Sequence, residues 1–479
     1  METATLPQIS ERLLDEKLAA LEKARQWSPR VVSRLENLIR AGDDFSLFRI
    51  NPVQYAKEKG MEEQEAIDVF LHATVAGLFQ MNWHLLCPGC TSVVESFTTL
   101  KTFDCHYHCE ICNVNFEAAL DDYIQISFTV APEIRSIPFH DPEKLSADDY
   151  LLKYRFSREG IMTNGEKWID AVLPFLRHHS FVEPGERVTF NGEVTEGVVI
   201  FNDLLNHIGH GLPVTGAPDG GVVKVRLNGT AIEAESKILT PGKKSFEVRN
   251  ESGKRGLLTL MNLPADYHER FAITFAPFLS GKRLLTSQSF RDLFHYEVVQ
   301  GMESLGVKNI AIIFTDLKGS TALYERIGDL KAFSLVRQHF DILGKVVARN
   351  SGAIVKTIGD AVMGSFMNPR DALKAALEMQ KEVAAMSQTP GGKDIILKIG
   401  IHSGASIAVN LNERLDYFGQ TVNIASRVQE LAGADEICVT DDVYGYAGVK
   451  EQLGRMKVTP GKAKLKGVLD EMNVYRIAA

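Results

Sequence analysis

The spacing of hydrophobic residues predicts a helical start to the chain. Residues 1–40 are rich in charged side chains, and Leu13, Leu14, Leu18 and Leu21 recur at positions that share one face of a helix. A stripe of this kind needs an apolar partner surface. We therefore expect these leucines to pack against the rest of an N-terminal helical region.

Two further helices are predicted after residue 51. Pro52 opens the first helix, Gly60 ends it, and residues 62–79 continue as the second. Two short helices around a glycine turn resemble half of a winged helix. The second helix starts with several acidic side chains, which would repel phosphates, so a packing role is favoured over DNA binding.

Short β-rich runs separated by Gly, Pro and Asn fill residues 120–280. Their lengths and regular separation predict a β-sandwich-like domain. This region shows no catalytic constellation. His207 and His210, in the sequence NHIGHG, are possible metal ligands, but isolated pairs of this kind are more often ordinary loop or core residues.

From residue 307 the pattern changes to alternating strands and helices, after a helical stretch at 290–306 that suits a connector. The expected order is a strand, two helices, two strands that meet at Gly359 and Asp360, and then helix, strand, helix and strand. This order predicts a ferredoxin-like sheet with helices on one side. Cys438 lies in the last of these strands, and we expect it to be a buried core thiol.

Composition narrows the class of protein. Of the 479 residues 45% are hydrophobic, and the formal net charge is -8, which argues against wholesale binding to nucleic acid or to an anionic membrane. No apolar run approaches the roughly 20 residues that a bilayer span needs. The first residues include acidic side chains and lack the apolar segment of a signal peptide. We expect a soluble, cytoplasmic protein with no nucleic-acid partner and no membrane span.

Five of the six cysteines lie between residues 87 and 112. Cys87 and Cys90 form one C-x-x-C pair, Cys109 and Cys112 form another, and eighteen residues separate the pairs, which is a spacing typical of tetrahedral Zn²⁺ sites. The spare donors Cys105, His106 and His108 are alternative ligands. Disulfide or redox roles are less favoured in a reducing compartment. The pattern predicts a zinc ribbon whose metal is structural.

These features together predict a multidomain α+β protein. We expect a helical region with a zinc ribbon at 1–120, a β-rich, sandwich-like regulatory domain at 121–285, a helical connector at 286–306 and a ferredoxin-like domain at 307–479. At roughly 150 residues per domain, the length allows about three domains with cores of their own.

Candidate chemistry lies at the start of the ferredoxin-like domain. Asp316 follows a buried strand and precedes a helix, and ligands collect at such strand ends. The backbone N–H groups of Gly319, Ser320 and Thr321 at the helix start can hold phosphate oxygens. Gly359 and Asp360 fit a two-residue hairpin turn that exposes the carboxylate at its tip. Alone, either aspartate is more simply a cap or a turn residue, but two carboxylates beside a phosphate loop suit Mg²⁺.

Residues 307–478 resemble the class III nucleotidyl cyclases, the catalytic domain of adenylate and guanylate cyclases. Four motifs carry the resemblance in the family's order: FTDLKGST, KTIGDAVM, LDYFGQTVNIASR, and KLKGV followed by VYRI. The first two correspond to metal motifs and supply Asp316 and Asp360, with the Leu317 carbonyl as an additional metal ligand. The resemblance implies two Mg²⁺ or Mn²⁺ ions per site.

The same resemblance implies how the base is read. Lys356 falls at the purine-reading lysine position and Asp416 at its acidic partner. The lysine would donate to N1 of adenine and the carboxylate would accept from the 6-amino group, which favours ATP over GTP. After GIHSG the family's glycine-rich continuation is replaced by ASIAVNLNER, so we expect the loop before Asp416 to be built differently.

Three further positions take roles from the resemblance. Asn423 and Arg427 match the family's transition-state pair, and their i, i+4 spacing places both on one helix face. Lys466 matches the phosphate-binding lysine, with Lys462 and Lys464 as alternatives for that role.

The implied function is an adenylate cyclase that converts ATP to 3′,5′-cyclic AMP and pyrophosphate. In this family one copy supplies the metal aspartates and another supplies the purine and transition-state residues. One domain here holds both sets, so the resemblance implies a homodimer. The zinc-ribbon region resembles regulatory modules of bacterial class III cyclases, whose ligand or partner the sequence does not indicate. The alternatives are a guanylate cyclase, or a catalytically weak cyclase-like protein used for dimerisation or binding.

Overall fold

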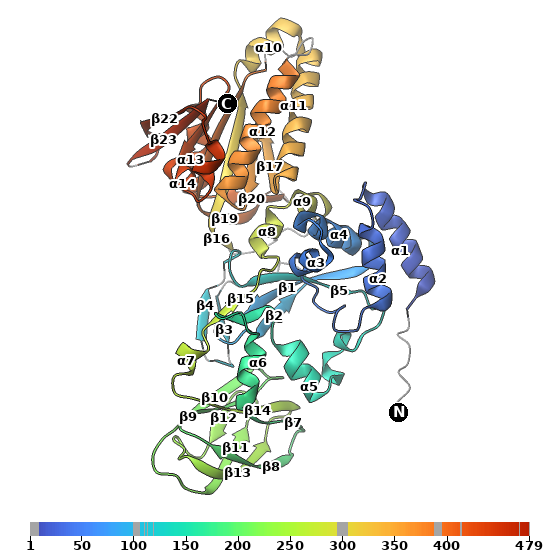
Figure 1. Cartoon of the computed structure of the whole chain (residues 1–479), viewed down its shortest axis with the longest axis vertical. Helices are drawn as coiled ribbons and strands as arrows, with labels where there is room; N and C mark the ends of the chain where they lie inside the picture. Colours follow the sequence, from blue (N-terminus) through green and yellow to red (C-terminus); the bar gives the residue numbers. More distant parts are fainter. Residues whose placement is uncertain are drawn as a thin grey trace. The chain divides into compact units, whose positions relative to one another are not determined.

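The computed structural model describes residues 9–98, 106–109, 111–112, 114–117, 119–294, 305–387, 395–411, 414–468 and 470–478. For residues 268, 320–322 and 387 it describes the backbone only. The chain forms two compact units (Figure 1). The first combines Met1–Thr98, Cys105–Ala118 and Tyr123–Leu279, and the second combines Thr99–Asp104, Ala119–Asp122 and Ser280–Ala479.

The first unit begins with four helices: α1 (Glu11–Ala24), α2 (Val31–Ala41), α3 (Pro52–Lys59) and α4 (Glu63–Ala76). Leu14, Leu18 and Leu21 are buried on one face of α1, as the pattern predicts. The last predicted helix is shorter than expected. Gly77, with φ at 84°, ends α4, and Phe79 already begins a strand.

That strand is the centre of a three-stranded sheet with the order β2-β1-β5, formed by β1 (Phe79–Leu86), β2 (Val93–Phe97) and β5 (Ile124–Val130). Every residue of β5 is buried. Between β2 and β5 the chain forms a separate hairpin of β3 (His106–Cys109) and β4 (Val114–Glu117). The chain therefore leaves and re-enters this sheet around the second cysteine pair.

Two four-stranded sheets follow and enclose a common apolar core that includes Val199, Phe201, Phe246 and Val248. The first has the order β10-β9-β14-β7: β7 (Leu176–Val182), β9 (Gly197–Asp203), β10 (Ile208–Val214) and β14 (Gly256–Leu263). The second has the order β12-β11-β13-β8: β8 (Arg187–Val194), β11 (Gly221–Leu227), β12 (Ile232–Ala234) and β13 (Gly242–Asn250).

Short elements connect the two parts of the first unit. They are η2 (Pro138–His140), η3 (Pro142–Lys144), α5 (Ala147–Asp149), η4 (Tyr150–Arg155), β6 (Gly160–Met162), α6 (Trp168–Val172), η5 (Leu173–Phe175), α7 (Tyr267–Arg270) and β15 (Ile273–Phe275). β15 pairs with β6, so the chain that leaves the sandwich returns beside the chain that enters it.

The second unit is built on one large sheet with the order β17-β18-β16-β19-β21-β23-β22, with β20 paired to β19. Its strands are β16 (Leu305–Leu317), β17 (Gly352–Ile358), β18 (Ala361–Phe366), β19 (Leu397–Leu411), β20 (Arg414–Phe418), β21 (Glu436–Thr440), β22 (Val458–Lys464) and β23 (Glu471–Ala478). The neighbours β17, β18, β16 and β19 reproduce the strand order of a ferredoxin-like fold, which confirms the predicted architecture of this domain.

The helices of the second unit are α8 (Gly281–Leu285), α9 (Gln288–Leu293), α10 (Ser320–Ile327), α11 (Asp329–Arg349), α12 (Pro369–Ser387), α13 (Gln420–Glu430), α14 (Asp441–Tyr444) and α15 (Val449–Leu453). α11 and α12 lie side by side against one face of the sheet, where Ile399, Ile401, Ile437 and Val439 point (Figure 1).

The expectation that helices cover one side only is wrong for α13. Ile424 and Val428 of α13 pack with Cys438 and Val474 in a separate cluster. Cys438 lies between Ile437 and Val439 in β21, and successive strand residues face opposite sides of a sheet. α13 therefore covers the other face, and Cys438 is the buried core thiol that the sequence predicts.

α8 and α9 belong to the second unit; α8 ends just before the predicted connector, and α9 occupies its start. Residues 295–304, which make up much of that connector, lie outside the described residues, and residues 305–306 already belong to β16. In the same unit Leu120 donates its N–H to the Gly306 carbonyl, and Asp121 accepts from the Lys308 N–H. The described part of the chain contains no helix with the length and apolar character that a membrane crossing requires.

Candidate active site

Asp316 and Leu317 end the central strand of the second unit. β16 lies between β18 and β19, and Asp316 is opposite Lys398 of β19. Burial raises the pKa of the Asp316 carboxyl above its ordinary value, and the negative charge of Asp360 raises it further. The two predicted metal ligands are therefore close enough to repel each other.

Asp360 lies in the hairpin between β17 and β18. Ile358 pairs with Ala361, so Gly359 and Asp360 form the two-residue turn that the sequence predicts. Gly359 has φ at 63°, which favours glycine at the first turn position. The turn does not expose the carboxylate as the sequence predicts: the Oδ2 atom of Asp360 is buried and has no hydrogen-bond partner in the described part of the chain.

The paired carboxylates fit a divalent cation. A buried carboxylate oxygen without a partner is unfavourable unless something binds it, and a second carboxylate beside it increases the repulsion. Mg²⁺ and Mn²⁺ prefer such hard oxygen ligands and supply the missing positive charge. The geometry therefore supports a metal site at Asp316 and Asp360.

His339 is a neighbour of this site that the sequence analysis missed. It lies on α11, is fully buried, and neither ring nitrogen has a hydrogen-bond partner among the described residues. Burial lowers the pKa of His339 to about 4, although the charge of Asp360 opposes this shift, so the ring is neutral at physiological pH. Its central position on α11 resembles that of any core residue, and only the fold brings it toward Asp360.

The predicted phosphate loop lies directly after Leu317. Gly319 has φ at 79°, is exposed, and precedes the first residue of α10. No atom lies within 4 Å of the position that a Cβ on Gly319 would take. The N-terminus of α10 therefore opens to free space, and the side chains of Ser320 and Thr321 lie outside what the structure describes.

Lys356 and Asp416 meet although sixty residues separate them. The Lys356 Nζ lies 2.5 Å from Oδ2 of Asp416, whose other oxygen accepts from the Tyr417 N–H. Asp416 is 5% exposed, whereas the lysine side chain is 36% exposed. Both residues line a cavity of about 390 Å³ to which Arg414 also contributes.

The segment ASIAVNLNER, where the sequence departs from the family pattern, extends the sheet. Its first seven residues continue β19 to Leu411, and the strand then pairs with β20 through Leu411 and Arg414. Residues 412 and 413 lie outside the described residues. Asp416 is therefore placed by a two-stranded extension, with Val409 opposite it in the register.

Two side chains of α9 form hydrogen bonds to the strands that carry Lys356 and Asp416, and the sequence predicts neither contact. The Gln288 side-chain oxygen accepts from the Ile354 N–H at 2.7 Å, two residues before Lys356. The Arg291 guanidinium donates to the Leu415 carbonyl at 2.9 Å, one residue before Asp416. An amide and a guanidinium in a short helix give no sequence signal for such long-range contacts.

Asn423 and Arg427 lie on α13 at the predicted i, i+4 spacing. Asn423 is exposed, and the Arg427 guanidinium pairs with Glu430 at 2.6 Å. In the described part of the chain, neither side chain is hydrogen-bonded or ion-paired to Asp316 or Asp360. The structure of one copy therefore does not bring these residues to the metal ligands.

Lys466 follows β22 in the turn toward β23 and is exposed. Lys462 and Lys464, the alternatives for its role, are exposed residues of β22. The structure thus places all three lysines on the surface of one hairpin and brings none of them to Asp316 within a single copy, as far as the described contacts extend.

The four cysteines of the C-x-x-C pairs converge. The sulfurs of Cys87, Cys90, Cys109 and Cys112 all lie within 4.8 Å of one another. Cys87 and Cys112 are 3.3 Å apart and Cys90 and Cys109 are 3.7 Å apart, which is too long for disulfide bonds. Tetrahedral Zn²⁺ with Zn–S bonds of about 2.3 Å requires sulfurs roughly 3.8 Å apart, so the cluster fits this metal.

The spare donors around this cluster differ in their surroundings. His108 Nδ1 is hydrogen-bonded to Asn115 at 2.8 Å, His106 is exposed, and Cys105 lies outside the described residues. His207 accepts from the Arg155 guanidinium at 2.8 Å, and burial lowers its pKa to about 4. His207 is therefore an ordinary hydrogen-bonded residue, as the sequence analysis favoured.

Comparison with known families assigns both parts of the chain. The model of a family of unknown function, DUF5939, matches residues 14–292, which is more than half of the chain. The chain belongs to this family. A second model, described as the adenylate and guanylate cyclase catalytic domain, matches residues 302–479. This DUF5939 protein therefore carries a class III nucleotidyl cyclase catalytic domain at its C-terminal end.

Individual relatives match part of this chain. An adenylate cyclase of Anabaena cylindrica is 28% identical over 200 residues, which are 38% of this chain and 40% of the relative. Adenylate cyclase 1 of Rhizobium meliloti is 26% identical over 185 residues, 36% of this chain and 27% of the relative. The match thus spans less than half of the length of either relative.

A solved structure also shows similarity to part of this chain. The adenylyl cyclase CyaB from P. aeruginosa is 21% identical, with a TM-score of 0.33, and the match covers 37% of this chain and 97% of that structure.

Proposed function

We propose that the catalytic domain converts ATP to 3′,5′-cyclic AMP and pyrophosphate at sites shared between two copies of the chain. The observation that carries the proposal is the pair of carboxylates at Asp316 and Asp360, one with a buried oxygen that lacks a partner. The same domain holds a lysine–carboxylate pair that can read a base. The names of the relatives, which are adenylate cyclases, support ATP as the substrate.

Asp316, Asp360 and the Leu317 carbonyl would hold two Mg²⁺ or Mn²⁺ ions. When bound, these ions neutralise the triphosphate and lower the pKa of the ribose 3′-hydroxyl that attacks the α-phosphorus. The protein's own part is to hold Asp316 just before the open N-terminus of α10 and Asp360 in the neighbouring hairpin turn. Backbone N–H groups at Gly319, Ser320 and Thr321 would bind phosphate oxygens there.

Lys356 and Asp416 would select adenine. In the arrangement implied by the family resemblance, the lysine donates to N1 and the carboxylate accepts from the 6-amino group. Because Asp416 is almost fully buried, a base that presents an acceptor to its carboxylate would be repelled without compensation from solvent, and that loss discriminates strongly. The ion pair at 2.5 Å supports this role because it orients both groups before the base arrives.

Asn423 would orient the ribose, Arg427 would stabilise the charge that develops on the α-phosphate, and Lys466 would bind the leaving pyrophosphate. The orientation of α13 supports a site shared between copies. The Gln429 backbone packs on Gly400 of the same chain. Each helix residue is rotated by about 100°, so Asn423 and Arg427 lie away from that contact and are available to a second copy.

We further propose that Cys87, Cys90, Cys109 and Cys112 hold a structural Zn²⁺. The spacing of their sulfurs supports a closed tetrahedral site with no position for a substrate. The hairpin of β3 and β4 is short, and a metal would contribute much of the free energy that keeps it folded. Reduced thiols and an ATP substrate both fit a cytoplasmic location.

The proposed activity is tested with the purified full chain, ATP or GTP, and Mg²⁺ or Mn²⁺, by measuring cyclic nucleotide and pyrophosphate in parallel. We expect equimolar cyclic AMP and pyrophosphate, and a kcat/KM for ATP at least 100-fold above that for GTP. Asp360→Asn removes one charge without a change in size and should abolish the product. A higher kcat/KM with GTP would overturn the adenine assignment, and the absence of product from both nucleotides would overturn the enzyme assignment.

A further inference from the structure

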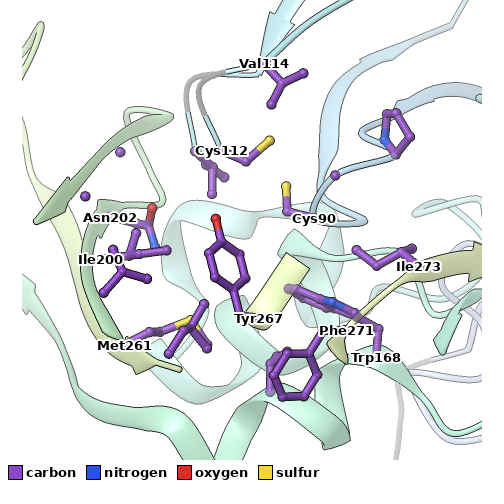
Figure 2. A pocket seen from close by; sticks show the side chains of 18 of the residues that line it. Cys90, Cys112, Val114, Trp168, Ile200, Asn202, Met261, Tyr267, Phe271 and Ile273 are labelled. Atoms are coloured by element: carbon purple, nitrogen blue, oxygen red, sulfur yellow. The ribbon is translucent and has the colours of Figure 1, made fainter. Parts of the chain in front are cut away.

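A cavity of about 670 Å³ lies in the first unit, between the cysteine hairpin and the outer face of one sandwich sheet. Figure 2 shows Cys90 and Cys112 on one side of it, Asn202, Ile200 and Met261 on another, and Tyr267 pointing into the middle. Its volume falls within the range of roughly 300–1,000 Å³ that is typical of small-molecule sites. None of the residues discussed above for the proposed catalytic site lines it.

The outer face of one sandwich sheet is polar at β8, whereas the outer face of the other is apolar at β9. On β8 the outward residues are polar, including Arg187, Thr189 and Glu193. On β9 the residues on the outer face are Val198, Ile200 and Asn202, while Val199 and Phe201 fill the sandwich core. A strand that is apolar on both faces is expected to have its outer face covered or occupied.

Glycines create the hollow on this face. Gly209 and Gly211 of β10 are opposite Asn202 and Ile200 in the register, so they share the outer face with them. Both line the cavity, and their missing side chains leave its floor open. A Cβ on Gly211 would meet only a Val198 methyl at 3.7 Å, which is an ordinary contact, so the strand itself does not require glycine there.

The chemistry of the walls selects an uncharged molecule. Trp168, Phe271 and Tyr267 supply aromatic surface, and Ile200 and Met261 supply aliphatic surface. Among the residues that the structure describes, no aspartate, glutamate, lysine or arginine lines the cavity. An anionic ligand would lose its hydration there without gaining an opposite charge.

Asn202 places an unsatisfied polar atom at this cavity. It is 4% exposed, its Nδ2 atom donates to the Thr259 hydroxyl at 3.4 Å, and its Oδ1 atom has no hydrogen-bond partner in the described part of the chain. Buried polar atoms in native proteins are nearly always satisfied, so this oxygen calls for a donor from the cavity. One water would satisfy it, but filling the space with water would place on the order of twenty molecules against apolar walls.

We propose that this cavity binds a neutral, largely aromatic small molecule whose N–H or O–H group donates to Asn202 Oδ1. The site is separate from the cyclase chemistry, and the inference stands whether or not the catalytic domain cyclises ATP. Tyr267 also lines the cavity, with its hydroxyl toward the cysteine side in Figure 2.

The test uses the full chain and the fluorescent probe N-phenyl-1-naphthylamine, which is neutral, aromatic and carries one N–H donor. Its emission rises when it enters an apolar site, so a titration gives the affinity and stoichiometry. Three matched comparisons define the site: the N-methylated probe, which lacks the donor, the sulfonated probe 1-anilinonaphthalene-8-sulfonate, which adds a charge, and variants of the protein.

We expect one saturable site per chain, with the sulfonated probe bound at least ten-fold more weakly. Gly211→Leu fills the hollow and should weaken the neutral probe at least ten-fold. Gly221→Leu, on β11, is the control and should change nothing, because no atom lies within 4 Å of the added Cβ. Asn202→Leu should weaken the N–H probe about ten-fold while leaving the N-methylated probe unchanged.

The ratio of the two neutral probes is measured on a single variant, so it does not depend on how well that variant folds relative to the wild type. An Asn202→Leu ratio equal to that of the wild type would overturn the proposal. No saturable binding to the wild-type chain, or equal binding to the wild type and to a folded Gly211→Leu variant, would also overturn it.

Discussion

Gly400 of β19 lies directly against the backbone of α13. A Cβ at this position would lie 2.2 Å from the Gln429 nitrogen and 2.3 Å from the Gln429 Cα. Both are backbone atoms of a helix, so no side-chain rotation can relieve the overlap. Carbon atoms pack at about 3.5 Å or more, so Gly400→Ala should push α13 outward by roughly 1 Å.

That displacement should affect both stability and activity. Overpacking of a core contact costs about 1–3 kcal/mol. For a domain of this size, such a loss lowers the midpoint of thermal unfolding by roughly 3–10 °C. α13 carries Asn423 and Arg427, and a shift of about 1 Å in catalytic groups can lower the rate 100-fold. We therefore expect cyclic AMP formation by Gly400→Ala to fall by about two orders of magnitude.

Gly344→Ala is the matched control, because Gly344 lies within α11 and no atom lies within 4 Å of the added Cβ. Alanine favours the helix by about 1 kcal/mol over glycine, so this variant should unfold slightly above the wild type and keep its activity. Differential scanning calorimetry and the cyclic AMP assay measure both effects. A Gly400→Ala chain with the melting midpoint and activity of the wild type would refute the close packing of α13 on β19.

Three further predictions concern the two metal sites and the hydrogen bond from Arg291 to the strand that carries Asp416. Asp316→Asn should raise the unfolding midpoint of the metal-free chain at pH 7. The folded-state pKa of Asp316 is raised, so its ionised form lowers the stability of the folded state at pH values above that pKa. Calorimetry should therefore find that the stability gained by Asp316→Asn disappears as the pH falls toward 3.8, and a gain independent of pH would contradict the raised pKa. Arg291→Met keeps the length of the side chain but removes the hydrogen bond to the Leu415 carbonyl. Steady-state kinetics should show kcat/KM for ATP reduced about ten-fold, with an unchanged circular dichroism spectrum. Unaltered kinetics would show that this hydrogen bond does not position Asp416. Elemental analysis should find one zinc ion per chain in the wild type. Cys90→Ser should lose this zinc, whereas Cys438→Ser should retain it, and full zinc occupancy in Cys90→Ser would exclude the four-cysteine site.

Local chemistry made much of the catalytic unit predictable. The hairpin at Gly359 and Asp360 follows from the backbone preference of glycine at a two-residue turn, and the structure has it there. The strand order follows from the sequence of elements, because a ferredoxin-like sheet has few alternatives. The period of α1 likewise predicts Leu13, Leu14, Leu18 and Leu21 on one face; the last three are buried and Leu13 is half-buried.

Long-range packing was less predictable. α13 packs on the sheet face where Gly400 has no side chain. Nothing near Gly400 or Gln429 in the sequence indicates that these two residues are in contact. The end of α4 was placed too late because residues 78 and 79 are apolar and continue the pattern, whereas Gly77 in the left-handed conformation stops the helix. His339, Gln288 and Arg291 were missed because their partners are distant in sequence.

The cavity of the first unit had a weak signal that could have been read. The run GVVIFND is apolar on both strand faces, and two glycines alternate with His210 in the next strand. The sequence predicts His207 and His210 as possible metal ligands, whereas in the structure the neighbouring Gly209 and Gly211 line the cavity. Alternating glycines opposite an apolar strand are therefore worth examining as a mark of a cavity.

The most direct test of the shared catalytic site is complementation between two inactive variants. Asp316→Ala and Arg427→Ala chains are mixed in equal amounts under conditions of proven subunit exchange, and cyclic AMP formation is measured. In a two-fold dimer, half of the dimers are mixed and each of these holds one intact site, so activity should return to about a quarter of the wild-type value. Activity that stays at the level of the separate variants, despite exchange, would contradict a site built from two copies.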